Sequence, residues 1–429
     1  MRNLPTESGG LRRFRRTARP RCRADFVVMV VMMFLFALAS MAPAADAQGI
    51  QHLISPGDHW ADLAERLRPG DQIILMPGRH RPAHFDDLQG TANRPITIRG
   101  LSRSHPSTIE AQREGIRLRR CQHVEIRDLT ITGATVSGIE VVDDAPERAG
   151  AEPFESHVTI RNVRVLNTGP TGRRHAVRLK GVADVAVKDS HFEAWGGSAV
   201  AIIGCQRVTI TDCTMIGRAG FGQLNAVQAR AGSTAVRIEN CTIRDAGLTA
   251  FALGGVSDPE DFRPALQDED DSTGSRSLRH ELDQVRVQHN LIQGGESAIA
   301  FINVSRAIVR QNTILAPTKW VYVVSDERDD PRLGSIDRCQ FGSNLITWPA
   351  GTLDRLTAVG ANGSPRGLTV EENLWWAEPN EDGTDPDPVL SESPAGMLQF
   401  QQAVDVDPKL DGKYRPQTPE AQIFGRHAP

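Results

Sequence analysis

A repeat of 23 or 24 residues constrains the fold of this chain more than any other feature of its sequence. The stretch GIRLRRCQHVEIRDLTITG begins at Gly115, and related stretches follow it along the chain. Further copies begin at Gly138, Ala176, Ala199, Ala226, Ala250 and Ala298, with a divergent copy near Val321. Apolar and polar residues alternate within each copy, which is typical of strands with one buried side. Strand-forming repeats of this length predict a β-solenoid, in which each copy forms one coil.

The apolar residues of the copies fall into columns that stacked coils would bury. One copy shows all three columns: Val177 and Leu179, then Val185 and Val187, then Phe192. A fourth column lies in the turn between the second and third strands, where late coils carry Asn290, Asn312, Asn344 and Asn373. Stacked asparagines can hydrogen-bond along the solenoid axis, so we predict an asparagine ladder. Coils should follow one another at ~4.8 Å, the spacing of paired strands.

Two cysteines occupy the same turn column in consecutive coils. Cys213 and Cys241 are therefore predicted to be buried neighbours, either as two thiols or as a disulfide. Parallel side-chain directions suit a disulfide badly, which favours the thiols.

The N-terminus carries the pattern of a targeting segment. Eight arginines precede the apolar run FVVMVVMMFLFALA, and an A-x-A site ends at Ala47. We predict that residues 1–47 are a signal peptide and that the mature protein is periplasmic or secreted. A membrane anchor is the alternative, although the run is short for a bilayer core of ~30 Å.

The remaining chain divides into three parts. We expect residues 48–110 to form an N-terminal cap with the first coil, residues 111–376 the repeats, and residues 377–429 a C-terminal loop and cap that covers the last coil. A short capping helix is predicted within residues 58–71, with Asp58 as its N-cap. Insertions at residues 143–156 and 255–283 interrupt the repeats, and long loops on a rigid stack often border a binding groove.

The charge of the mature chain excludes some functions. Without residues 1–47, 41 basic residues face 50 acidic ones, so the net charge is −9. This balance disfavours nucleic acid as a partner. Five cysteines without a C-x-x-C pair give neither a complete disulfide framework nor a zinc cluster. We expect a monomer that does not bind membranes once the signal peptide is removed.

Two stretches resemble known proteins. GDQIILMPGRHRPAHFDDLQGTANRPITIRG, residues 70–100, resembles the N-terminal region of secreted right-handed parallel β-helix proteins, particularly the chondroitinase B-like and alginate lyase-like polysaccharide lyases. The stretches from HAVRLKGV to AIAFINVSRAIVRQNTILAP are similar to a large group of uncharacterised bacterial β-helix proteins. The resemblance covers roughly residues 50–420 and implies an all-β, right-handed parallel β-helix of about ten coils.

The resemblance also implies a chemistry. Chondroitinase-type lyases use a Lys and an Arg on the helix face as base and acid, and calcium neutralises the substrate carboxylate. In the uncharacterised group, polar residues often stand at positions matching Ala201 and Ala252, and a Lys matches Arg230. This chain departs from that pattern, which puts activity at that column in doubt. The fold does not decide the activity either, because one fold carries many activities.

The outward residues of the first strand place cations together. Arg117, Arg119, Arg178, Lys180 and Arg230 are predicted to form a local basic strip, and an extended basic groove suits an anionic polysaccharide. Lys180 is the expected base, because neighbouring positive charges favour its neutral form. Arg178 and Arg230 are expected to bind the uronate carboxylate. A solvated strand face with its cations paired to acids is the alternative.

Other residues near this strip complete the predicted site. The further substrate-binding candidates are His175, Gln228, Arg263, Trp195 and Trp320, the tryptophans stacking on sugar rings unless they are buried. Glu140, Asp143 and Asp144 offer calcium three oxygen ligands, with a metal-free acidic loop as the alternative.

These features predict a secreted polysaccharide lyase that cleaves an acidic, uronate-containing polysaccharide by β-elimination. A non-catalytic glycan-binding or surface β-helix is the alternative. A glycoside hydrolase of the same fold ranks third, because hydrolysis needs paired carboxylates and the first-strand columns of the repeats hold Glu140 as their single acid.

Overall fold

The computed structural model describes residues 49–102, 104–144, 148, 150–266, 278–326, 330–353, 355–360, 362–380, 400–401 and 403–428. The predicted signal peptide, residues 1–47, lies outside these residues. Within the described ranges, no helix is long and apolar enough to cross a membrane.

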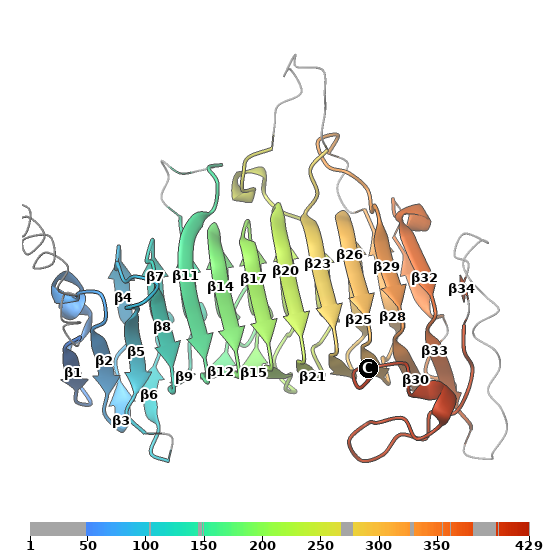
Figure 1. Cartoon of the computed structure of the whole chain (residues 1–429), viewed down its shortest axis with the longest axis horizontal. Helices are drawn as coiled ribbons and strands as arrows, with labels where there is room; N and C mark the ends of the chain where they lie inside the picture. The colour runs from blue at the N-terminus through green and yellow to red at the C-terminus, as the bar shows by residue number, and fades with distance from the viewer. Residues whose placement is uncertain are drawn as a thin grey trace, which may run out of the picture. The chain divides into compact units, whose positions relative to one another are not determined.

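Three parallel sheets wind around one core and form a right-handed parallel β-helix, which confirms the predicted fold (Figure 1). Sheet A consists of β1 (Gln51–Ile54), β2 (Gln72–Leu75), β5 (Ile96–Gly100), β8 (Val124–Arg127), β11 (Phe154–Arg161), β14 (Val182–Lys188), β17 (Gln206–Thr211), β20 (Ser233–Glu239), β23 (Leu282–Gln288), β26 (Val304–Arg310), β29 (Cys339–Gly342), β32 (Leu368–Glu371) and β34 (Phe400–Gln401). Every pair of neighbouring strands along this order is parallel, because the chain returns to a sheet only after a full coil.

The other two sheets follow the same order. Sheet B consists of β3 (Gly78–His80), β6 (Ser107–Glu110), β9 (Thr130–Thr132), β12 (Arg164–Thr168), β15 (His191–Trp195), β18 (Thr214–Ile216), β21 (Thr242–Arg244), β24 (Leu291–Gln293), β27 (Thr313–Leu315), β30 (Leu345–Pro349) and β33 (Leu374–Glu378). Sheet C consists of β4 (Ala83–Asp86), β7 (Glu114–Arg119), β10 (Ser137–Val142), β13 (His175–Lys180), β16 (Ser198–Ile203), β19 (Asn225–Arg230), β22 (Thr249–Gly254), β25 (Ser297–Ile302), β28 (Trp320–Ser325) and β31 (Thr357–Val359).

The predicted apolar columns are the core. Val177 pairs with Val200 in sheet C, Val185 with Val208 in sheet A, and Phe192 with Met215 in sheet B. These side chains are all buried. Their neighbours in sequence point outward, so each coil shows the polar half of its alternation to solvent.

The turn from sheet A to sheet B requires an unusual backbone. The residue before the turn column has a positive φ in coil after coil: Asp128, Asn162, Asp189, Asp212, Asn240, His289, Gln311, Ser343 and Glu372. Asp and Asn tolerate the left-handed region better than most residues, which explains their frequency here.

The asparagine ladder is confirmed. Nδ2 of Asn290 donates to Oδ1 of Asn312 at 3.0 Å, and the same bond joins Asn312 to Asn344 and Asn344 to Asn373. In each of these three pairs, the same Oδ1 also accepts from the backbone N–H of the asparagine in the preceding coil, at 3.0–3.1 Å. These amides are buried, and the ladder supplies the partners that their burial requires.

The two stacked cysteines are buried free thiols, as the parallel geometry favours. The pKa of Cys213 is raised well above its usual value by its hydrogen bond with Cys241 and by burial. The Cys213 thiol is therefore not a reactive nucleophile in the folded protein.

The predicted capping helix is a 3-10 turn, η1 (Ala61–Arg66), whose N-cap is Trp60. Asp58 does not cap it: the Asp58 carboxylate accepts from the backbone N–H of Ser55 at 2.8 Å and so closes the preceding turn. Trp60 is 1% exposed and packs against Phe85, which covers the first complete coil.

The C-terminal segment packs in two places: residues 400–401 and Val404 pair with the strands of the last coil, and residues 421–424 pack beside sheet B. Ala421 and Phe424 form an apolar cluster with Leu345 and Leu374, the outward residues of β30 and β33. β34 extends sheet A beside β32. The remaining short 3-10 turns are η3 (Pro259–Asp261), η4 (Pro365–Gly367) and η7 (Pro419–Ala421).

Candidate functional site

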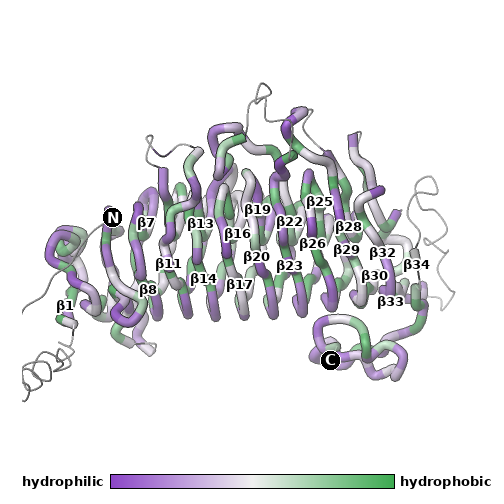
Figure 2. Tube along the Cα trace, turned by 45° about the horizontal axis from the view of Figure 1, so that its top comes forward, coloured by the Kyte–Doolittle hydropathy of each residue, from purple (hydrophilic) through white to green (hydrophobic). Residues whose placement is uncertain are grey.

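The outer face of sheet C carries the predicted basic strip. Register places Arg117, Glu140 and Arg178 in one column and Lys180, Ile203 and Arg230 in the next. Figure 2 shows β7, β13, β16, β19 and β22 in this order along one wall. The strip is therefore a property of one surface, as the alternation predicted.

The strip is not a row of free cations, because acids alternate with the arginines. Glu140 accepts from Arg178 at 3.3 Å and lies 3.6 Å from Nε of Arg117. Asp144 contacts the other end of the Arg117 guanidinium at 2.5 Å. The predicted alternative, cations paired to acids, thus describes this part of the face. About 30% of the Arg117 side chain and 27% of the Arg178 side chain remain accessible to a ligand.

The second column is bridged by a residue from the long insertion. Lys180 and Arg230 are two strands apart, about 9.6 Å along the sheet. Asp261, at the end of η3, lies between them: its Oδ1 is 2.6 Å from Nζ of Lys180 and its Oδ2 is 3.6 Å from Nη1 of Arg230. Phe262 packs in an apolar cluster with Ile203, which fixes η3 over this part of the sheet. Asp261 thereby occupies the space between the two cations.

A buried polar network supports Arg230 from behind. Its guanidinium donates to Oγ of Ser257 at 2.9 Å, and Ser257 donates to Glu281 at 2.5 Å. Glu281 also accepts from the backbone N–H of Ala231 at 2.8 Å. Burial raises the pKa of Glu281 and lowers the pKa of Arg230, although their attraction opposes both shifts. The network holds the guanidinium in place, and Arg230 is only 7% exposed.

His175 begins β13 beside the strip and is buried. Its Nδ1 accepts from the backbone N–H of Ser198 at 3.1 Å. Burial, followed by the charge of Arg178, lowers the pKa of His175 to about 3. The imidazole is therefore neutral at physiological pH and cannot bind an anion as a cation.

The predicted calcium ligands do not fit a calcium ion in this structure. Glu140 is held by two arginines, as described above, and Asp144 by Arg117. Asp143 is 1% exposed and contacts Nε of Arg148 at 2.5 Å. Guanidinium groups thus contact all three carboxylates, and the ligand oxygens of the three do not lie within 4.8 Å of one another in the described part of the chain.

The remaining predicted residues divide into buried and accessible groups. Trp195 is fully buried and donates to the backbone oxygen of Asn225 at 2.8 Å, so its predicted sugar-stacking role is wrong. Arg263 is 4% exposed and lies across Gly181 and Gly204, so it is a residue of the insertion that packs against the coil. Gln228, Arg119 and Trp320 stay partly exposed on sheet C, where they can contact a ligand.

Sequence reasoning missed Asp261, Ser257 and Glu281. All three lie in the insertion at 255–283, which we assigned only the role of bordering a groove. The one available signal was that this loop carries acids next to a strip of cations. Nothing in the repeat register specifies which of these acids reaches the strip, because the loop lies outside the repeat.

Comparisons with known proteins agree with the fold. A family model described as the right handed beta helix region matches residues 114–328. A search of curated proteins finds no match. Among solved structures, the A-module of the mannuronan C-5 epimerase AlgE6 from Azotobacter vinelandii has a TM-score of 0.52 at 14% identity, over 81% of this chain and 94% of that one.

Two further similar structures are polysaccharide lyases. The PL6 family polysaccharide lyase Pedsa3628 from Pseudopedobacter saltans has a TM-score of 0.50 at 10% identity, over 89% of this chain and 99% of that one. The PL6 family alginate lyase AlyGC has a TM-score of 0.48 at 14% identity, over 87% of this chain and 56% of that one. At these identities the similarity establishes the fold alone.

Proposed function

This chain belongs to the right handed beta helix region family, and from that premise we propose that it binds an acidic, uronate-containing polysaccharide on sheet C and cleaves it by β-elimination. The observation that carries the proposal is the cationic group formed by Arg178, Lys180 and Arg230 on one face, in which Arg178 and Lys180 are partly exposed and Arg230 is buried beside the insertion. The pattern of residues 1–47 supports a location outside the cytoplasm, where such a polymer is met.

The reaction assigns one task to each cation. Arg178 and Arg230 neutralise the uronate carboxylate, which makes the proton on the adjacent carbon acidic. Lys180, as a free amine, accepts that proton. The electron pair left on carbon forms the double bond, and the glycosidic C–O bond breaks. The leaving oxygen gains a proton from an acid or from water.

Asp261 makes this chemistry conditional. While its carboxylate contacts Nζ of Lys180 at 2.6 Å, Asp261 stands between this nitrogen and a substrate proton. The substrate carboxylate must therefore displace Asp261 from Arg230 and Lys180 before elimination begins.

A second candidate function is non-catalytic glycan binding. It is favoured by Ala201 and Ala252, which continue the outer column of Arg178 beyond the charged residues and offer no reactive group. Binding needs only the accessible arginines, whereas cleavage also needs a free amine.

The test measures the ultraviolet absorbance of unsaturated uronate over time with alginate, pectate, chondroitin and ulvan-type substrates. We expect product from the wild-type protein, and a loss of at least about a hundredfold in Lys180→Ala, the size of a general-base contribution. Lys188→Ala, an exposed lysine on sheet A, is the matched control and should keep full activity.

Asp261→Asn separates the two functions further. Removing the competing charge should raise the affinity for the acidic polymer by about tenfold, a typical value for one charged hydrogen bond. Asp62→Asn, at an exposed position in η1, should change nothing. Binding without absorbance in every protein would assign the glycan-binding role, and no binding by any of them would exclude both.

A further inference from the structure

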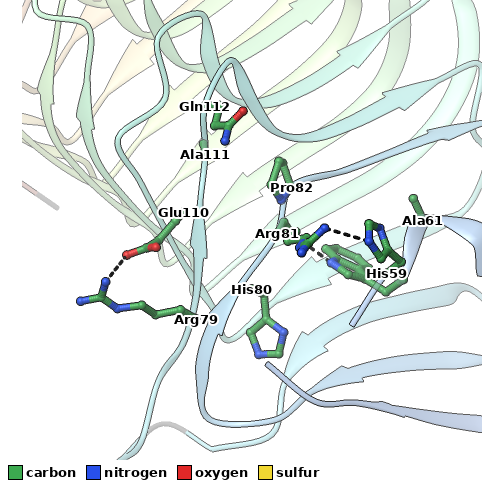
Figure 3. A pocket seen from close by; sticks show the side chains of 10 residues that line it. His59, Ala61, Arg79, His80, Arg81, Pro82, Glu110, Ala111 and Gln112 are labelled. Carbon is green, nitrogen blue, oxygen red and sulfur yellow. Dashed lines mark hydrogen bonds and ion pairs between the residues drawn. The ribbon is translucent and has the colours of Figure 1, made fainter. Parts of the chain in front are cut away.

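A hollow of about 700 Å³ lies where β3 leads into β4, beside the N-terminal cap and apart from the basic strip. Three segments line it: residues 59–61 next to η1, residues 79–82 between β3 and β4, and residues 110–112 after β6 (Figure 3). The hollow is large enough for one or two sugar units, since ligand sites of ~300–1,000 Å³ hold drug-sized molecules.

One arginine in this hollow has no carboxylate partner among the contacts of the described residues. Arg81 lies with its Nη1 2.8 Å from Nε2 of His59. The other arginine, Arg79, pairs with Glu110 at 3.0 Å. Figure 3 shows these two arginines on opposite sides of the hollow. The charge of Arg81 is therefore available to an anion.

The position of Arg81 is fixed before any ligand arrives. The indole N–H of Trp60 donates to the backbone oxygen of Arg81 at 3.0 Å. Trp60 itself is 1% exposed and packs against Phe85 in the core. Since backbone and guanidinium are both held, less conformational entropy is lost on binding.

His80 lines the same hollow without presenting a polar atom to it. Its side chain is 3% exposed and faces the core in register with Ile109. Its Nε2 lies 2.6 Å from the backbone oxygen of Met76, and its Nδ1 has no accessible surface. His80 therefore supports the wall of the hollow and does not contact a ligand.

We propose that this hollow is a second binding site for the acidic polysaccharide, and that it takes a sugar unit bearing a carboxylate or a sulfate. Arg81 binds the anionic group. Glu110, at the opposite rim, accepts a hydrogen bond from a ring hydroxyl. A neutral sugar lacks the group that Arg81 requires, so the site selects acidic glycans. This inference rests on the proposed function for the identity of the polymer.

The test measures the binding of acidic oligosaccharides, such as oligouronates, and of neutral oligosaccharides of equal length by calorimetry. Arg81→Gln should weaken the binding of the acidic oligosaccharide by about tenfold, because it removes one charged hydrogen bond. The position is exposed, so the change should not affect folding. Glu110→Gln should strengthen it by a few fold, since a repelling charge disappears. Arg237→Gln, an exposed arginine on sheet A, is the matched control and should leave affinity unchanged.

The outcomes separate this site from the one on sheet C. Unchanged affinity in Arg81→Gln, with binding lost in Arg178→Gln, overturns the second site and leaves the proposed function standing. A loss of affinity in both variants supports two sites on the protein that bind one polymer. If the wild-type protein binds no acidic oligosaccharide, the proposed function fails and the second site falls with it.

Discussion

The solenoid carries two polar columns that obey different rules. Inside, four asparagines repeat the same group from Asn290 to Asn373, because an amide is donor and acceptor at once and can bond to its own copy. Outside, Arg117, Glu140 and Arg178 alternate in sign, because like charges in adjacent coils would repel. A neutral column can therefore be extended by repetition, whereas a charged column ends unless an opposite charge follows.

The difference also concerns what each column does. The amides of the inner column are buried and fully partnered, so they have no spare capacity for a ligand. The outer arginines keep more than a quarter of their side chains accessible. The inner column should stabilise the fold, and the outer column should contribute to binding while adding little stability.

Breaking the inner column should have the largest effect. Asn312→Ala removes the bonds to Asn290 and Asn344 and leaves buried backbone groups without partners. We expect the free energy of unfolding to fall by about 3 kcal/mol, measured by urea denaturation. Asn93→Ala, in an exposed turn, is the control and should stay within about 0.5 kcal/mol of the wild type. A small effect at both positions would remove the stabilising role of the ladder.

A histidine at the border of the two environments should give a pH-dependent effect of intermediate size. The pKa of His175 in the folded protein is about 3, below the ordinary value of 6.5, so between these values the unfolded chain binds a proton that the folded chain does not. Stability should therefore fall as pH falls through this window, by about 2 kcal/mol between pH 7 and pH 5.

The difference between the wild type and His175→Asn isolates this contribution, since other groups titrate in both proteins. The pH-dependent loss should be smaller in the variant, while His105→Asn, an exposed position, should follow the wild type. Identical pH profiles for wild type and His175→Asn would show that the imidazole is not held neutral by burial.

Breaking an outer ion pair should have the smallest effect on stability. Arg119 binds Asp86 through two hydrogen bonds of 2.6 and 3.1 Å, with 36% and 51% of the two side chains exposed. Arg119→Gln should lower the free energy of unfolding by less than about 1 kcal/mol, because solvent screens the pair. Urea denaturation measures this change as well. A fall in the free energy of unfolding as large as that in Asn312→Ala would show that the two columns do not differ in their contribution to stability.

Much of the fold could be predicted because stacking copies each local pattern into its neighbours. The alternation around Val177 and the spacing of the asparagines were enough to assign inside and outside to most strand residues. The ends were harder: η1 is a 3-10 turn and Asp58 serves another turn, because nothing stacks beyond the first coil to enforce the pattern. The cations of the site were predicted for the same reason as the core, since they share its register.

The partners of those cations could not be predicted. Asp261 reaches Lys180 from more than eighty residues further along the chain, through a loop that Phe262 fixes onto sheet C. Trp195 and Trp320 were both predicted to stack on sugar rings, yet one is buried and the other partly exposed. Such outcomes depend on packing between segments that do not repeat.

The sequence by itself determined the coil, its three sheets, the buried amide column and the face on which the cations gather, because a period repeated at constant register leaves one way to bury its apolar side. Only the tertiary structure decided which charges are neutralised, which aromatic rings are accessible, and where hollows remain. Those features arise where insertions and caps meet the coil, and contacts between distant segments, unlike a period, leave no regular trace in the chain.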